Sequence, residues 1–263
     1  GQIDRRFESR VLVPGFIDPH VHPSLPAILT QFPFLAPDDW SLPTGEFPGA
    51  TTPDAYKSRL QALAAEHTDP DTPFITWGYH PLWHGEVWRD DLNQWFGNQP
   101  VMIWHRSFHE IIGNDAAWAM LGVTAEDAAL TPEANWERGH FYEGGLKAVV
   151  AKLRFLFEPA RFGKGMQNFL TMMHQSGVTT ALDMGTGIFG NPVQEIASIR
   201  AVAEAYPVPS RIILTPIILD FMVRQVPPEA ALAEIKTWQA SNSDRVTVAH
   251  HFNLLLSGAV FSG

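Results

Sequence analysis

The fold class is decided by residues 178–183, with the sequence VTTALD, and residues 211–218, with the sequence RIILTPII. Both are short apolar runs rich in β-branched residues, which predicts strands buried on both faces. A last strand is expected over 246–256. Helical spacing predicts helices before, between and after these strands, over 162–176, 193–205 and 228–240. Strands that alternate with helices predict an α/β fold with a parallel sheet covered by helices.

The first half of the chain has a different organisation. A short apolar strand is expected over 11–18, and residues 23–50, which contain many Pro and several Gly, are expected to be irregular. Further elements are predicted farther along: helices over 55–67, 114–121 and 147–157, and strands over 74–79 and 101–104. Eight of the nine Trp residues lie between Trp40 and Trp136. This clustering indicates either aromatic packing in an insertion or the wall of an apolar pocket.

The composition excludes several classes of function. The 263 residues include 18 Lys and Arg and 28 Asp and Glu, and the net charge of −10 argues against binding to nucleic acid. No apolar run is long enough to span a membrane, and no signal segment is visible, so a cytoplasmic location is expected. Cys is absent. Any metal must therefore be held by His and carboxylate side chains, and thiolate nucleophiles are excluded.

The candidate metal site lies in residues 14–22, with the sequence PGFIDPHVH. His20 and His22 are two residues apart at the end of an apolar strand, so both imidazoles are expected on one face. Two imidazoles at the carboxyl end of a strand supply half of a divalent metal site. Asp18 shares this face and is expected to orient a ligand His from behind.

This motif resembles the first-strand metal motif of the amidohydrolase superfamily. Other segments resemble its branch called amidohydrolase family 3, with the N-substituted formamide deformylase-like proteins as the nearest relatives: 77–80, 100–110, 114–117, 139–145 and 176–180. The resemblance implies a TIM-type (β/α)8 barrel with a small β-sandwich built from both chain ends. We expect both ends of this chain to be cuts within a longer protein.

The resemblance also implies how the chain is divided. Residues 11–263 would form a partial barrel with about the first four strands, and residues 1–10 would be a remnant of the sandwich. A long, loop-rich insertion would follow strand 1, with its Trp-rich part at about 38–145. Such an open barrel cannot close by itself.

The activity implied by the resemblance is metal-dependent hydrolysis of a non-peptide C–N bond in a small amide, of the amide or N-substituted formamide type. A divalent metal, zinc in most relatives, would activate water and polarise the carbonyl oxygen. The catalytic Asp base and two further His ligands of the family would lie beyond Gly263, so the chain alone is expected to be inactive. A homo-oligomer is compatible with this family.

Three residues are candidates for binding the substrate. The resemblance places His109 at the substrate mouth, with a capping or core imidazole as the alternative. Glu143 either orients the substrate or begins the following helix, where a carboxylate is favoured. Asp183 ends a strand and either lines the site or caps the next turn. His80 and His84 are expected to pack among Trp side chains in a loop, with metal ligation as the alternative.

Two functions from other classes stay open. One is a catalytically incomplete or non-catalytic protein that keeps the amidohydrolase fold for binding only. The other is a dinucleotide-dependent oxidoreductase, because residues 185–190, GTGIFG, match a Gly-x-Gly-x-x-Gly turn after a strand. Pro192 follows at once, and no acidic residue closes a second strand at the expected distance, which disfavours this second alternative.

One position departs from the family pattern. Many relatives carry on the fourth barrel strand a Lys that bridges two metals when it is carboxylated. The matching stretch here is 252–258, which puts Asn253 in the place of the Lys. An amide is a far weaker ligand than an anionic carbamate, so we expect at most one tightly bound metal, or impaired catalysis.

Overall fold

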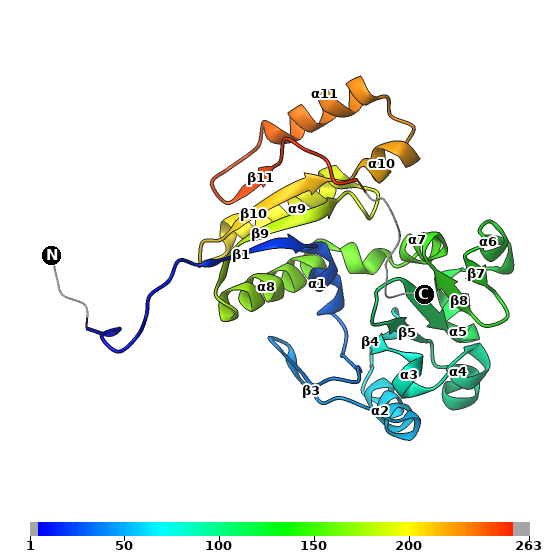
Figure 1. Cartoon of the computed structure of the whole chain (residues 1–263). Coiled ribbons are helices and arrows are strands. Elements are labelled where there is room, and N and C mark those ends of the chain that lie inside the picture. Colours follow the sequence, from blue (N-terminus) through cyan, green and yellow to red (C-terminus); the bar gives the residue numbers. More distant parts are fainter. Residues whose placement is uncertain (1–4, 255–263) are drawn as a thin grey trace.

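The structure is a computed structural model that describes residues 5–254. Figure 1 shows two lobes, one around a parallel sheet and one around a mixed sheet, with the N-terminal segment extending away from both. In the part of the chain described, no helix is long and apolar enough to cross a membrane.

The first lobe is built on a four-stranded parallel sheet. Its strands lie in the spatial order β1 (Phe16–Val21), β9 (Val178–Thr186), β10 (Arg211–Pro216) and β11 (Val246–Val248). The helices of this lobe are α8 (Pro159–Gln175), α9 (Pro192–Ala205), α10 (Ile218–Val223) and α11 (Pro228–Gln239). The predicted α/β class with a parallel sheet is confirmed.

The core of this lobe explains why its elements are readable in the sequence. Ile212 and Leu214 of β10 are fully buried, and they pack in one cluster with Leu170 of α8 and Ile199 of α9. Apolar residues therefore repeat with a strand period in the sheet and with a helical period in the helices. Gly177 ends α8 in the left-handed region, with φ of 73°, which a glycine adopts without steric cost.

Strand β1 pairs directly with β9, so all the elements between them are inserted between two neighbouring strands. The inserted sheet has the order β4 (Phe74–Tyr79), β5 (Val101–His105), β6 (Glu110–Gly113), β8 (His140–Tyr142) and β7 (Ala134–Asn135). A separate hairpin consists of β2 (Trp40–Leu42) and β3 (Gly45–Phe47). The inserted helices are α1 (Ser24–Leu29), α2 (Pro53–Ala65), α3 (Pro81–His84), α4 (Arg89–Phe96), α5 (Asp115–Leu121), α6 (Ala125–Ala129), α7 (Gly144–Val150) and the 3-10 helix η1 (Arg154–Phe157).

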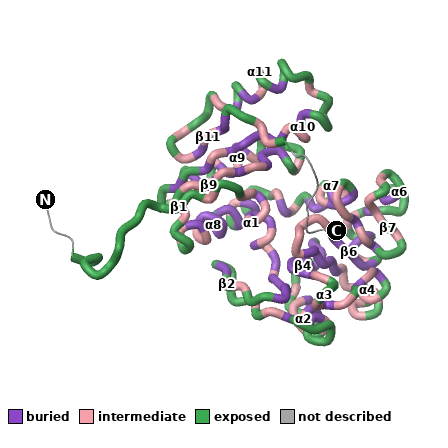
Figure 2. The backbone as a smooth tube through the Cα atoms, in the orientation of Figure 1, coloured by how far each residue is buried: buried purple, intermediate pink, exposed green. Residues whose placement is uncertain are grey.

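The Trp-rich part of the chain forms the core of the insertion. Trp77, Trp104 and Trp118 are buried there against Phe34 and Phe141, and the tube in Figure 2 is largely buried along the inserted strands. Of the two interpretations of the Trp cluster, the structure therefore favours aromatic packing.

Several predicted elements differ from the structure. The expected strand over 11–18 begins only at Phe16, because residue 16 is the first to lie opposite β9. The expected helix over 147–157 is divided into α7 and η1. The expected strand over 246–256 ends at Val248, and its last two residues lie outside the described part. Residues 23–50 contain α1 and the β2–β3 hairpin in place of an irregular stretch.

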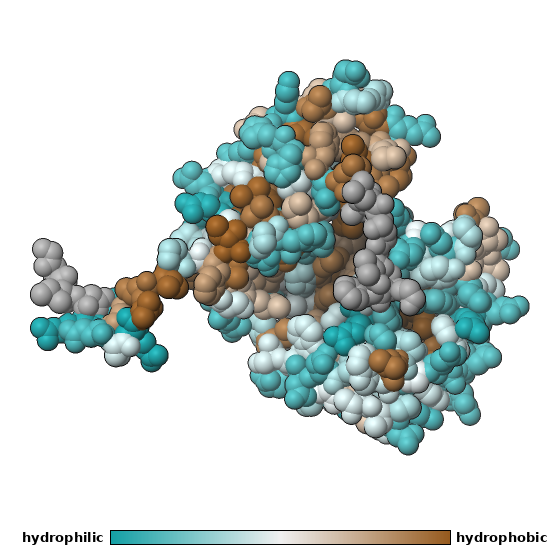
Figure 3. Space-filling view, viewed as in Figure 1, coloured by the Kyte–Doolittle hydropathy of each residue, from teal (hydrophilic) through white to brown (hydrophobic). Residues whose placement is uncertain are grey.

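The N-terminal segment carries the residues predicted to be a sandwich remnant. Residues 5–10 are exposed and form turns and a bend. Figure 3 shows apolar surface where this segment joins the first lobe. The large apolar side chains exposed along this stretch are Phe7, Val11, Leu12, Val13, Phe16 and Ile17.

The loop expected around His80 and His84 contains the one-turn helix α3, and His84 is buried in it. Its Nδ1 accepts a hydrogen bond from the main-chain N–H of His80 at 3.1 Å, and its Nε2 donates to the carbonyl oxygen of Ala50 at 2.8 Å. The ring also stacks on Tyr56, with centroids 4.1 Å apart. Because one ring nitrogen must accept while the other donates, this environment requires a neutral imidazole, and His84 is a packing residue.

Burial lowers the pKa of His84 to about 4, which predicts acid sensitivity of the insertion. The unfolded chain binds a proton at this histidine near pH 6.5, whereas the folded chain does so only near pH 4. The free energy of unfolding should therefore fall by about 3 kcal/mol as the pH decreases through this window. His105, whose pKa burial also lowers to about 4, adds a loss of the same sign. Urea denaturation followed by Trp fluorescence at pH 7.5, 5.5 and 4.5 measures the effect.

A His84→Gln variant provides the control for this prediction. It should be less stable at pH 7.5 than the wild type. It should also lose less stability on acidification, because it lacks one of the histidines whose pKa is lowered by folding. An unchanged pH dependence in the variant would show that His84 is protonated as easily in the folded chain as in the unfolded chain.

Candidate active site

The two predicted metal ligands lie together at the carboxyl end of β1. His20 and His22 have ring centroids 5.3 Å apart with an edge-to-face angle of 88°. Nδ1 of His22 lies 3.4 Å from Oδ1 of Asp183, a residue of the neighbouring strand β9. The carboxylate of Asp183 is only 3% exposed, whereas the His22 side chain is 28% exposed. The His22 side chain is therefore partly open to solvent, whereas its carboxylate partner is buried.

Asp183 accepts two hydrogen bonds from the last residues of β9. Its Oδ1 accepts the main-chain N–H of Gly185 at 2.9 Å, and its Oδ2 accepts the hydroxyl of Thr186. The His22 ring lies against Gly185 so closely that a Cβ there would be 2.7 Å from Nδ1. These contacts agree with the alternative that Asp183 caps the residues after it, and they place its carboxylate beside His22, while contact with substrate stays a prediction.

Asp18, which was expected to orient a ligand His, forms its hydrogen bond with the main chain and not with an imidazole nitrogen. Its Oδ1 accepts the main-chain N–H of His20 at 3.1 Å. The carboxylate that reaches an imidazole nitrogen is thus Asp183, which comes from another strand. An acidic partner of this kind fixes the ring orientation and the tautomer of a metal-binding histidine.

The histidines fit part of a metal site. Two imidazoles bound to one tetrahedral zinc, with Zn–N of about 2 Å, have centroids about 5 Å apart, and the observed 5.3 Å agrees. A catalytic zinc takes three protein ligands. Within residues 5–254, no group of three His, Cys, Asp or Glu side chains is arranged to hold a metal. The described residues therefore supply two ligands of such a site and not a complete one.

A second carboxylate, Glu195 of α9, lies behind this centre. Its Oε1 accepts the hydroxyl of Ser24, and its Oε2 accepts the main-chain N–H of Gly187 at 2.7 Å. Burial, with the negative charges of Asp183 and Asp220, raises the pKa of Glu195 to about 7. The turn that matches Gly-x-Gly-x-x-Gly thus has its amide turned to Glu195 at the start of α9, where a dinucleotide would place its pyrophosphate. This contact argues against the oxidoreductase alternative.

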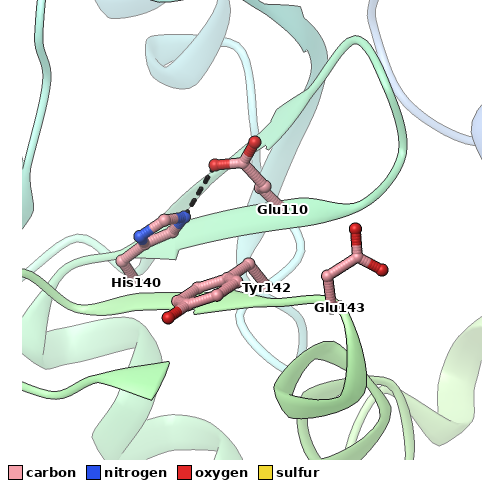
Figure 4. Close-up of a pocket in the computed structure, with 4 residues that line it drawn as sticks. All are labelled: Glu110, His140, Tyr142 and Glu143. Atoms are coloured by element: carbon pink, nitrogen blue, oxygen red, sulfur yellow. Dashed lines mark hydrogen bonds and ion pairs between the residues drawn. The ribbon is translucent and has the colours of Figure 1, made fainter. Parts of the chain in front are cut away.

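The inserted sheet carries a second cluster of polar side chains. Glu110 of β6 and His140 of β8 lie on neighbouring strands, and Oε2 of Glu110 is 2.8 Å from Nε2 of His140. Both line a cavity of about 220 Å³ together with Tyr142 and Glu143 (Figure 4). Two of the three candidate substrate residues meet at the same place, because Nδ1 of His109 is 3.1 Å from Oε2 of Glu143.

The charges of this cluster follow from its contacts. The hydrogen bond with His140 holds the pKa of Glu110 below its usual value, so Glu110 is a carboxylate at neutral pH. Burial keeps His105 neutral, and its Nδ1 lies 2.7 Å from Oγ of Ser107. The cavity is therefore lined by a fixed negative charge and by hydrogen-bonding groups.

Two residues beside this cavity have a left-handed backbone that non-glycine residues rarely adopt. Phe108 has φ of 70° and Glu143 has φ of 45°. Such strain is found most often at ligand and catalytic sites, where surrounding contacts hold it. Here the main-chain N–H of Glu143 donates to the carbonyl oxygen of His109 at 2.9 Å. Phe108 also lies 6.4 Å, between ring centroids, from Phe189 in the loop after β9. This contact between Phe108 and Phe189 joins the inserted lobe to the loop that follows β9.

A comparison with known families identifies the chain. The sequence profile described as "Amidohydrolase family" (Amidohydro_3) matches residues 8–260. The chain belongs to the amidohydrolase family. No curated protein matches this amidohydrolase chain significantly.

Two solved structures share the fold of this amidohydrolase chain. An uncharacterised metal-dependent hydrolase from Pyrococcus horikoshii OT3 matches with a TM-score of 0.59 and 15% identity, over 90% of this chain and 41% of the other. An uncharacterised metal-dependent hydrolase from Pyrococcus furiosus matches with a TM-score of 0.54 and 13% identity, over 89% and 42% of the two chains. The amidohydrolase chain thus spans about two fifths of the length of these structures.

The amidohydrolase structure brings together some predicted residues and adds others. His20 and His22 are adjacent, and His109 and Glu143 form a pair. Sequence reasoning missed the supporting contacts, because their partners are far apart in the chain: Ser24 with Glu195, His22 with Asp183, and Glu110 with His140. One signal for Glu195 was present in the sequence. It is an acidic residue in the first turn of α9, a helix that packs on the sheet, where a charged side chain needs a polar partner.

Proposed function

We propose that this chain forms the first part of a (β/α)8 barrel and carries half of the metal site of a hydrolase. Four parallel strands with intervening helices support this assignment. Within residues 5–254, β1 and β11 are the edges of the parallel sheet, where further barrel strands would pair. The remaining ligands and the base would come from parts of the family fold that this chain does not span.

The observation that carries the proposal is the His20, His22 and Asp183 arrangement at the carboxyl end of neighbouring strands. In barrel enzymes this end holds the active site. Nδ1 of His22 donates to Asp183, which leaves Nε2 as the nitrogen that would hold a divalent metal, most simply zinc. When bound, such a metal lowers the pKa of water and polarises a carbonyl oxygen. His20, whose ring lies next to that of His22, would bind the same ion through one of its ring nitrogens.

We infer that the substrate is a small amide, of the amide or N-substituted formamide type, whose non-peptide C–N bond is hydrolysed. His109 and Glu143 would contact it from the insertion, since Glu143 lines the polar cavity and its Oε2 lies 3.1 Å from Nδ1 of His109. The Glu110 carboxylate, which keeps its charge at neutral pH, can accept an N–H group of an amide or of the released amine.

One observation favours the non-catalytic alternative. Asn253, at the position of the family Lys, donates its side-chain amide to the carbonyl oxygen of Met184. Its main-chain groups also bond to β10 and α10, through Pro216 and Ile218. Asn253 is therefore a structural residue beside the site. A protein lacking the anionic bridge would bind at most one metal tightly, or would keep only a binding function.

Hydrolysis by the complete natural protein that carries this chain decides between these functions. We expect release of amine from N-substituted formamides and small amides, loss of this activity with a chelator, and recovery on adding Zn²⁺. Metal analysis should give about one ion per chain. A purified protein that holds the metal but releases no amine from any amide in the panel would support the binding-only function.

A further inference from the structure

The carboxylate of Glu195 connects the start of α1, which follows the metal strand β1, with the loop that follows β9. Ser24, which donates its hydroxyl to Oε1, comes two residues after His22. Gly187, which donates its main-chain N–H to Oε2 at 2.7 Å, comes four residues after Asp183. Ser24 is 3% exposed, so this bond is shielded from water. Both carboxylate oxygens thus hold the start of α1 against the loop after β9.

The end of β9, directly before Gly187, also contacts the imidazole of His22. The ring lies against Gly185 with no space for a Cβ, and its Nδ1 is 3.4 Å from Asp183. A movement of the loop at Gly187 relative to Ser24 would therefore change the position of the ring. Glu195 and Asp183 therefore both connect the chain after β1 with the chain at the end of β9, and only Asp183 reaches the ring itself.

The surroundings of Glu195 are strongly acidic. Asp183 and Asp220 raise its pKa, together with burial. Asp220 is itself paired with Arg224 at 2.7 Å. A carboxyl group placed among other carboxylates costs free energy. The hydrogen bonds to Ser24 and Gly187 offset that cost. They explain why a carboxyl group can be buried at this position.

We propose that Glu195 is a positioning residue that fixes His22 in its metal-binding orientation by holding Ser24 and Gly187. The inference rests on the proposed function, in which His22 is a metal ligand. Glu195 contacts neither substrate nor metal in this account.

The substitutions Glu195→Ala and Glu195→Gln separate the hydrogen bonds from the negative charge. Alanine removes both bonds. Glutamine keeps an oxygen for the N–H of Gly187, and its amide can donate to the Ser24 hydroxyl, which is able to accept. We therefore expect Zn²⁺ affinity of the complete protein to fall by about 10- to 100-fold in Glu195→Ala, and to stay within about threefold of wild type in Glu195→Gln.

A second readout does not depend on activity or on bound metal. In the metal-free protein, ¹⁵N NMR of the His22 ring should show a single tautomer protonated at Nδ1. In Glu195→Ala we expect averaged nitrogen shifts, because the ring no longer stays beside Asp183. The Gln variant should restore the wild-type shifts. A merely structural role would lower stability without moving this signal.

Glu204 provides the matched control, because it lies on the same helix and accepts the hydroxyl of Ser243 away from the metal strand. Glu204→Ala should change neither the Zn²⁺ affinity nor the His22 spectrum. Ser24→Ala removes one of the Glu195 bonds from the other side, and it tests the proposal if Glu195→Ala does not fold. Its loss of affinity should not add to that of Glu195→Ala.

Unchanged Zn²⁺ affinity in both Glu195→Ala and Ser24→Ala would overturn the proposal. A Glu195→Gln variant that binds Zn²⁺ as weakly as Glu195→Ala would overturn it as well. The His22→Ala variant distinguishes this from failure of the proposed function. If His22→Ala binds Zn²⁺ as tightly as wild type, the metal assignment is wrong. If it binds weakly while Glu195→Ala binds normally, only the positioning role is wrong.

Discussion

Replacing either His20 or His22 with Ala should remove metal and hydrolytic activity from the complete protein together. Each change deletes an imidazole from a pair whose ring centroids are 5.3 Å apart. Loss of a direct ligand should exceed the 10- to 100-fold effect typical of an outer-shell partner, so we expect Zn²⁺ affinity to fall by at least about 1000-fold. Metal analysis after gel filtration and an amine-release assay measure the two losses on the same samples.

His67 is the matched control for these variants. It lies in the insertion after α2, where its Nε2 is 2.8 Å from the carbonyl oxygen of Thr72. His67→Ala should keep metal and activity, and it should lose about 1 kcal/mol of stability with this hydrogen bond. Full metal occupancy in His20→Ala and His22→Ala would contradict the assignment of the site.

Asp183→Ala should have the second-largest effect, because Asp183 contacts the imidazole of His22 and also accepts two hydrogen bonds at the end of β9. The change leaves the N–H of Gly185 and the hydroxyl of Thr186 without their acceptor. Buried groups left unpaired cost about 1–3 kcal/mol each, so for these two groups we expect a loss of about 2–6 kcal/mol in the free energy of unfolding. Zn²⁺ affinity should fall by about 10- to 100-fold as well.

Asp183→Asn separates these two effects. An Asn oxygen can accept the N–H of Gly185, and the amide can donate to Thr186, so most of the stability should return. The negative charge beside His22 is lost, so the metal affinity should stay low. Denaturation in urea and Zn²⁺ competition titration measure the two quantities. Equal metal affinity in Asp183→Asn and wild type would show that His22 does not need this carboxylate.

The parallel-sheet lobe was largely predictable because its local signals agree. Apolar β-branched runs gave β9 and β10, and Gly177 marked the end of α8. In the insertion, Thr52 and Asn114 cap α2 and α5 as their side chains suggest. Strand ends were harder, because a strand extends only as far as its partner does, and residues 11–15 have no partner in β9.

The site was only half predictable for a related reason. His20 and His22 are close in sequence, so strand periodicity alone puts them together. Asp183 and Glu195 reach the same centre only because β1 pairs with β9 across the whole insertion. Nothing local in residues 14–22 indicates which distant strand will lie beside them, and Asp18 was the nearest available carboxylate. The pair of Glu110 and His140 likewise depends on the antiparallel register of β6 and β8.

The central claim is that His20 and His22 hold one metal ion through the nitrogens turned away from Asp183. The most direct test is an anomalous difference map at the zinc absorption edge, from crystals of the complete protein grown with Zn²⁺. We predict a peak about 2 Å from a ring nitrogen of both His20 and His22, with Nδ1 of His22 still facing Asp183. A strong peak elsewhere, with no density between these two rings, would contradict it.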